Sequence, residues 1–183
     1  MTLTSLLAGH LPADEKERAD LELMRQWASS LAEPFSRSQW PAHFTGSAVV
    51  VSPDGTRVVL VMHAKLNRWL QPGGHADAVD GGLMEQTALR EAREETGLDV
   101  ALHPAAPAPF DVDVHVIPAR KTDPEHRHLD VRYLVVAANP DALAHDPNES
   151  HGAQWLDWDE AISRADEAPL RRMLDKARRF VGR

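Results

Sequence analysis

The 183-residue sequence contains no cysteine, which excludes disulfide bonds, thiolate zinc sites and cysteine nucleophiles. No apolar run approaches the roughly 20 residues that a membrane-spanning helix needs. Basic residues are also scarce, with 20 Lys and Arg against 28 Asp and Glu, and the net charge of −8 gives no general attraction to nucleic acid or to an anionic membrane. The first residues, MTLTSLLAGHLPADEK, lack the basic segment and the long apolar core of a signal peptide. We therefore expect a cytoplasmic protein with no nucleic-acid or membrane partner.

The remaining composition and the periodicity of the apolar residues are typical of a folded α/β domain. Apolar residues make up 43% of the chain, enough for a sizeable core. Strands that are mixed with helices without strict alternation indicate a mixed sheet covered by helices, so we expect an α/β/α sandwich. The expected elements are a helix over 13–33, a hairpin over 46–63, a loop over 67–82, a helix over 83–96, strands over 105–119, 126–138 and 152–158, and a C-terminal helix.

The stretch REAREETGL, residues 90–98, places three glutamates on one face of the helix expected over 83–96. Glu91, Glu94 and Glu95 are spaced i, i+3 and i+4, where like charges repel by roughly a few tenths of a kcal/mol. The glycine pair in the preceding QPGGH lets the backbone approach a ligand closely. Oxygen-rich clusters select hard cations such as Mg²⁺ or Mn²⁺, which usually bridge carboxylates to substrate phosphates. The cluster therefore predicts a divalent metal site and a phosphoanhydride substrate.

At these residues the sequence resembles the Nudix (MutT-like) hydrolase family. The family signature has a glycine, five residues, a glutamate, seven residues and then R-E-apolar-x-E-E-x-G-apolar; REAREETGL fits the second half residue for residue. The first half, counted from Gly74, departs from the signature because Asp80 stands in place of the glutamate. Two extra residues, interpreted as an insertion at Gly81-Gly82, separate Asp80 from Arg90. The segment RWLQPGG is also similar to the family's W-x-x-P-G-G approach to the signature.

The resemblance implies hydrolysis of a nucleoside diphosphate linked to another group, with Mg²⁺ or Mn²⁺ as cofactor. The implied metal ligands are Glu91, Glu94 and Glu95 together with the carbonyl of Gly74, and the implied catalytic residues are Arg90, Glu91, Glu94 and Glu149. Family members take the general base from the signature or from a later loop, so Glu91 and Glu149 stay alternatives for that role. Glu149 is equally consistent with a solvated loop acid. Arg90 either fixes a carboxylate through a two-pronged hydrogen bond or helps to neutralise the cluster.

Three further residues, His75, His128 and Arg132, are predicted to bind substrate. His75 follows the glycine pair, where it either touches the substrate or caps the loop. His128 and Arg132 share one face of the strand expected over 126–138 with Asp130, and Asp111, Asp113 and His115 share a face of the preceding strand. These polar faces either line the mouth of the pocket or form the solvent side of the sheet. His126 and His128 form an H-x-H pair, but a dedicated zinc site is disfavoured without cysteines or a helical H-x-x-x-H.

We expect a Nudix hydrolase domain over residues 44–183, preceded by an N-terminal helical extension over residues 1–43. The expected partner is a small-molecule nucleoside diphosphate derivative, and the resemblance is compatible with a homodimer. A rival function is a Nudix-fold sensor that binds a nucleotide without cleaving it. The intact glutamates argue against the sensor, whereas the altered spacing after Gly74 favours it. An isomerase of isoprenoid diphosphates would need a cysteine, which the chain lacks.

Overall fold

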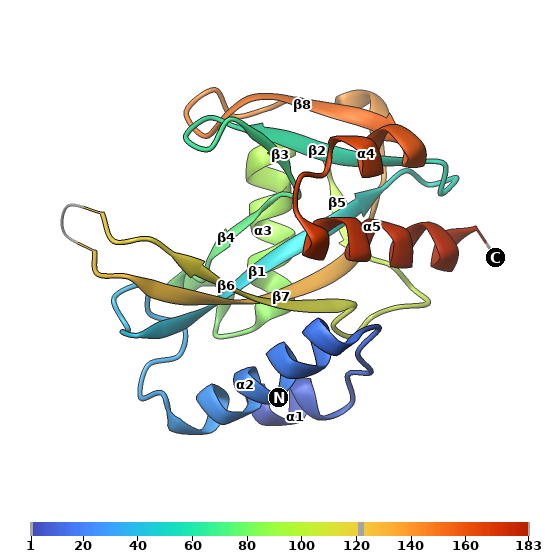
Figure 1. Ribbon diagram of the computed structural model, residues 1–183. Helices are drawn as coiled ribbons and strands as arrows, with labels where there is room; N and C mark the ends of the chain where they lie inside the picture. Colours follow the sequence, from blue (N-terminus) through green and yellow to red (C-terminus); the bar gives the residue numbers. More distant parts are fainter. Residues whose placement is uncertain (1, 121–122, 183) are drawn as a thin grey trace.

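The structure is a computed structural model that describes residues 2–120 and 123–182. It contains a mixed sheet of eight strands with helices on both faces (Figure 1). The strands are β1 (Ala42–Val51), β2 (Arg57–His63), β3 (Arg68–Leu70), β4 (Gly73–His75), β5 (Val100–Leu102), β6 (Asp111–Ile117), β7 (His126–Ala137) and β8 (Ser150–Asp157). The helices are α1 (Leu3–Ala8), α2 (Glu15–Ser30), α3 (Met84–Thr96), α4 (Trp158–Arg164) and α5 (Ala168–Val181), with single 3₁₀ turns η1 (Ala78–Asp80) and η2 (Pro140–Ala142).

Strand β1 organises the sheet because it changes partners along its length. On one side it runs parallel to β7, from the pair Ala42↔Arg127 to the pair Val51↔Val136. On the other side its middle pairs with β4, and its end pairs with β2 at Val51↔Val58. All other pairings in the described sheet are antiparallel, with β3 and β8 on β2, and β5 and β6 on β7. The hairpin predicted over 46–63 is confirmed, since β2 follows β1 through a short turn and pairs with it antiparallel.

Side chains that alternate along β1 supply two hydrophobic cores, one on each face of the sheet. Ala48 and Val50 pack in the core that includes the buried stripe of α3. Val49 and Val51 pack in the core formed with α4 and α5. Figure 1 shows α3 behind the central strands and α4 and α5 in front of them. The predicted α/β/α sandwich with a mixed sheet is thereby confirmed.

Helix α2 packs beside strand β6, and α1 packs against α2, below the sheet in Figure 1. Strand β6 pairs with β7 along one edge, and two carboxylates of α2 accept hydrogen bonds from its other edge. Glu17 accepts from the backbone N–H of Val112 at 3.3 Å, and Asp20 accepts from that of Val114 at 3.1 Å. Unpaired N–H groups on an edge strand can pair with a strand of another chain. Here two of these N–H groups on β6 are bonded to the carboxylates of α2 instead. The division into an extension and a domain stays a prediction.

Several short elements differ from the expectations. The segment 67–82, expected to be a loop, contains β3, β4 and η1. Strand β5 and helix α1 were not expected either. Elements of three to six residues are too short for apolar periodicity to reveal, and β3, β4 and β5 depend on pairing with strands distant in sequence. In the parts of the chain that the structure describes, none of the helices is both long and apolar enough to cross a bilayer.

Candidate active site

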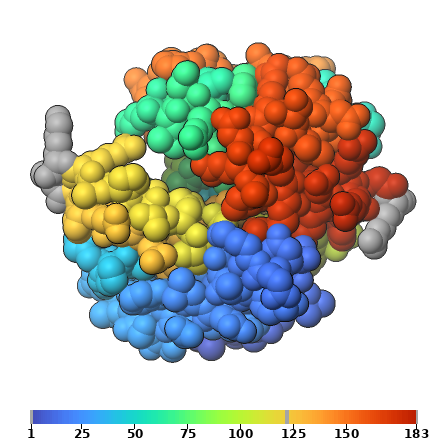
Figure 2. Space-filling model, in the orientation of Figure 1, coloured from blue at the N-terminus to red at the C-terminus, as the bar shows by residue number. Residues whose placement is uncertain are grey.

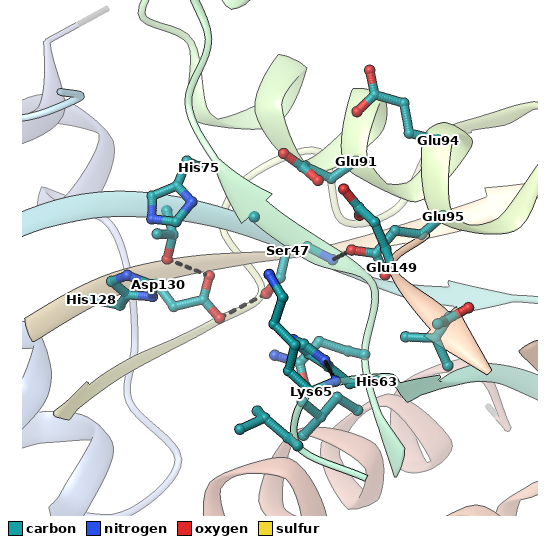
Figure 3. A pocket seen from close by; sticks show the side chains of 18 of the residues that line it. Ser47, His63, Lys65, His75, Glu91, Glu94, Glu95, His128, Asp130 and Glu149 are labelled. Atoms are coloured by element: carbon teal, nitrogen blue, oxygen red, sulfur yellow. Dashed lines mark hydrogen bonds between the residues drawn. The ribbon is translucent and has the colours of Figure 1, made fainter. Parts of the chain in front are cut away.

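A polar pocket of about 690 Å³ opens between α3, the β6–β7 pair and the turn that joins β2 to β3. In Figure 2 the hollow lies between the β6–β7 hairpin, in yellow, and the β2–β3 segment, in green. Glutamates of α3 line one side, and His75 and His128 line the other (Figure 3). Lys65 reaches into the pocket from the β2–β3 turn. The pocket therefore brings together most of the predicted site residues.

Helix α3 aims its glutamates at the pocket because its opposite side is buried. Met84, Ala88 and Ala92, four residues apart, are at most 1% exposed and pack against the sheet. Gly97 ends the helix in the left-handed conformation, with φ of 64°, as its position after the last turn predicts. In the last two turns before Gly97, Glu91 and Glu95 are buried at the floor of the pocket.

Three carboxylates converge at this floor. Oxygens of Glu91, Glu95 and Glu149 lie within 4.8 Å of one another. Burial raises the pKa of Glu91 to about 7 and that of Glu95 to about 8, and the neighbouring glutamates add to both shifts. Glu149 comes from the turn before β8, so its convergence on α3 depends on the tertiary fold. The side chain of Glu94 is 56% exposed at the rim of the pocket and pairs with Arg90.

This donor set fits a hard divalent cation such as Mg²⁺ or Mn²⁺. The converging atoms are all carboxylate oxygens, whose mutual repulsion a bound cation would relieve. Gly74 brings its backbone so close that a Cβ there would lie 2.7 Å from the carboxylate of Glu91. A side chain at position 74 would therefore push the Glu91 carboxylate out of its present place, and glycine leaves that place free. The neighbouring Gly73 N–H donates to Glu95 at 3.5 Å.

Arg90 connects the two halves of the signature. Its guanidinium donates through Nε and Nη2 to the two oxygens of Asp80, both at 3.0 Å. It also donates to Glu91 at 2.9 Å, to Glu94 at 2.8 Å and to the carbonyl of His75 at 2.8 Å. Both mechanisms considered for Arg90 therefore operate, because the side chain fixes carboxylates and also offsets their charge.

The structure also gives Asp80 and the inserted glycines a physical role. Asp80 is 3% exposed and accepts further hydrogen bonds from Thr87 and from the backbone of Asp77. Gly81 and Gly82 follow with φ of 61° and 74°, which turns the chain from η1 into α3. Compared with the family signature, Asp80 is one methylene shorter than glutamate and the turn to α3 is two residues longer. With both changes present, the Asp80 carboxylate still accepts hydrogen bonds from Arg90.

The opposite wall of the pocket carries imidazoles and hydroxyls. Burial lowers the pKa of His75 to about 4 and that of His128 to about 2, and neighbouring imidazoles lower both further. Both rings are therefore neutral at pH 7. Between them and the glutamates, Asp130 accepts hydrogen bonds from Thr45 at 3.1 Å and from Ser47 at 2.7 Å (Figure 3).

Arg132 does not line this pocket. Its side chain is 4% exposed and pairs with Asp111 and Asp113, both at 3.2 Å, and with Asp130 at 2.9 Å. The polar faces of β6 and β7 are therefore largely buried and do not form the solvent side of the sheet. Three of their residues, His115, His128 and Asp130, do line the pocket. A buried guanidinium occupied by three carboxylates is not available to a substrate, so the substrate-binding role predicted for Arg132 is not retained.

The sequence did not single out several pocket residues, among them Lys65, His63, Thr45, Ser47 and Asn148. Lys65 lies in a turn without a recognisable motif, and Thr45 and Ser47 lie with His43 in the part of β1 that precedes its apolar end. Their period-two spacing was the available signal, because it places both hydroxyls on one face of β1.

Comparisons with known proteins agree with this geometry. The fold and the acidic helix behind a glycine-rich strand define a Nudix-type hydrolase. The family model described as NUDIX domain matches residues 42–177, and the chain belongs to the Nudix family. This match confirms both the family and the enzyme class predicted from the sequence, a Nudix pyrophosphohydrolase. No match to a curated protein was found.

Solved structures with the same fold are distant in sequence. The Caenorhabditis elegans Ap4A hydrolase in a binary complex is 21% identical with a TM-score of 0.60, covering 76% of this chain and 97% of that one. The NUDIX domain of Shewanella oneidensis NrtR, in complex with ADP ribose, is 17% identical with a TM-score of 0.56 and coverage of 85% and 97%. The Escherichia coli dihydroneopterin triphosphate pyrophosphohydrolase is 15% identical with a TM-score of 0.55 and coverage of 73% and 92%. At these identities the likeness establishes the fold.

Proposed function

We propose that the protein hydrolyses a phosphoanhydride bond in a nucleoside diphosphate that is linked to another group, and that it requires Mg²⁺ or Mn²⁺. The observation that carries this proposal is the convergence of Glu91, Glu95 and Glu149 in a polar pocket. A diphosphate is the substrate that best matches buried carboxylates needing a divalent cation. Lys65 adds a positive charge on the substrate side of the pocket.

The proposed metal ligands are Glu91, Glu94 and Glu95 with the carbonyl of Gly74. A carboxylate oxygen of Glu149 lies within 4.8 Å of those of Glu91 and Glu95, beside the proposed cations. When bound, the cations neutralise the diphosphate and stabilise the charge that develops during attack on phosphorus. Arg90 acts as a positioning residue, since it holds Glu91 and Glu94 in place.

A general base has to remove a proton from the attacking water. Glu149 and Glu91 remain the two candidates. Glu149 is exposed on the turn before β8, whereas Glu91 is buried and already accepts a hydrogen bond from Arg90. We favour Glu149 because it is freer to exchange a proton with solvent between turnovers.

The test is a screen of nucleoside triphosphates, dinucleotides, nucleotide sugars and ADP-ribose in Mg²⁺, with the products identified. We expect cleavage of at least one compound by the wild-type protein. Glu94→Gln and Glu95→Gln should each lower kcat/KM by about 1,000-fold, because each removes a charge that serves the cations. Glu22→Gln, an exposed change on α2, is the matched control and should retain the full rate. Full activity in both site variants would refute the metal assignment.

The sensor alternative makes a different prediction in the same experiment. A protein that only binds nucleotides would give tight binding by calorimetry without cleavage of any compound in the panel. The altered spacing after Gly74 was the observation that favoured the sensor. Despite that spacing, Asp80 still forms an ion pair with Arg90 of the acidic helix, and this weakens the sensor alternative.

A further inference from the structure

Five of the ten histidines gather at the end of the pocket opposite the glutamates. The ring centroid of His43 lies 5.1 Å from that of His75, 4.9 Å from that of His128 and 5.1 Å from that of His126. The rings of His75 and His128 are 4.9 Å apart, and His115 lies 5.4 Å from His128. Contacts between neutral imidazoles contribute little favourable free energy, so the convergence of these five rings needs another explanation.

Three of these histidines are held together by the sheet itself. His43 on β1 is paired with His128 on the parallel strand β7, and His75 on β4 is paired with Thr45 of β1. Residues 43 and 45 are two apart, so these pairings place the three imidazoles on one face of the sheet. One ring nitrogen from each histidine lies within 4.8 Å of the other two.

The hydrogen-bonding state of the rings points to a missing ligand. The Nε2 atoms of His43 and His128 are buried and have no hydrogen-bond partner among the described residues. In His43, Nδ1 donates to the carbonyl of Gln39 at 3.3 Å, so Nε2 carries the free lone pair. Metal-binding histidines are typically oriented in this way by a second hydrogen bond from the other ring nitrogen. A buried acceptor without a partner costs free energy, which coordination of a cation would recover.

We propose that His43, His75 and His128 bind a first-row transition-metal ion such as Zn²⁺, at a site separate from the carboxylate cluster. Three imidazole nitrogens suit Zn²⁺ and related ions, whereas Mg²⁺ prefers oxygen ligands. Tetrahedral bonds of about 2.0–2.1 Å would place the nitrogens about 3.3 Å apart. The three nitrogens, now within 4.8 Å of one another, would therefore have to approach by up to about 1.5 Å. Because His75 and His128 line the pocket, the remaining coordination position faces the space where substrate is proposed to bind.

The sequence alone pointed away from this site. The H-x-H pair of His126 and His128 is a weak signal, and it contains only one of the three proposed ligands. The other two come from β1 and β4, which are distant in sequence and meet only through strand pairing.

The proposal is tested by measuring how much Zn²⁺ the full chain retains after treatment with a chelator, addition of Zn²⁺ and dialysis in excess Mg²⁺. The Mg²⁺ occupies the carboxylate cluster, so Zn²⁺ that remains reports on the histidines. We expect one Zn²⁺ per wild-type chain. His75→Gln and His128→Gln should weaken its affinity by more than about 100-fold, beyond the usual effect of losing an outer hydrogen bond to a metal ligand. The matched control His151→Gln changes an exposed histidine and should retain Zn²⁺.

A second measurement needs no variant. Zn²⁺ should shift the ring nitrogen resonances of His43, His75 and His128 in the wild-type protein and leave that of His151 in place. Absence of Zn²⁺ from the wild type, full retention in both histidine variants, or unshifted resonances of the three rings would overturn the proposal. Because the readout is metal content, it is independent of whether the protein cleaves a nucleotide.

Discussion

Replacing Glu95 with glutamine should make the metal-free protein more stable while removing its response to Mg²⁺. Burial and neighbouring glutamates raise the pKa of Glu95 from 4.5 to about 8. In the unfolded chain the carboxyl ionises near its ordinary pKa, so between pH 4.5 and pH 8 the folded chain binds more protons. The stability associated with Glu95 is therefore fully present below pH 4.5 and is lost as the pH rises through 8.

The size of the effect follows from the same pKa. A shift from 4.5 to about 8 corresponds to roughly 4 kcal/mol at pH 8. Glutamine keeps an oxygen that can accept from the Gly73 N–H, but its amide still has to be desolvated. We therefore expect Glu95→Gln to raise the free energy of unfolding at pH 8 by about 2 kcal/mol, with little change at pH 4.

The assay is urea unfolding at several pH values, with and without Mg²⁺. Mg²⁺ should stabilise the wild type at pH 8, where the carboxylates are ionised, and should barely affect Glu95→Gln. Glu22→Gln is the matched control, because that side chain is exposed on α2, outside the carboxylate cluster, and its loss should leave the response to Mg²⁺ unchanged. If Glu95→Gln lowered the stability of the metal-free protein, or if Mg²⁺ still stabilised it fully, repulsion at the pocket floor would not be the dominant effect.

Three other changes probe the surroundings of this cluster. Gly74→Ala would place a methyl carbon 2.7 Å from the carboxylate of Glu91, so we expect hydrolysis to fall by about 100-fold with little change in melting temperature; an unchanged rate would contradict the close approach. Asp80→Asn removes the charge that accepts two hydrogen bonds from Arg90 and should lower the free energy of unfolding by about 2 kcal/mol in urea, whereas an unchanged midpoint would show that the pair is dispensable. Arg132→Met leaves buried carboxylates without their cation and should cost about 3–5 kcal/mol by the same method; a neutral effect would mean that other cations replace it.

The sequence by itself determined the parts of the site that depend on local geometry. The spacing of Glu91 and Glu95 fixes them on one face of α3, because residues three and four apart are neighbours on any helix. Gly97 marks the end of that helix, because its left-handed conformation excludes most other residues. The alternation of apolar residues also gave the long strands, since a period of two belongs to the strand backbone itself.

The tertiary structure alone decided which distant residues join this helix. Glu149 reaches the pocket floor only because β8 pairs with β2, and Asp80 meets Arg90 only because two glycines turn the chain back. The same alternation that placed Arg132 on a polar face could not show whether that face is buried. Pairing of β1 with β7 and β4 brings His43 to the other histidines, and register between distant strands is a property of the assembled sheet.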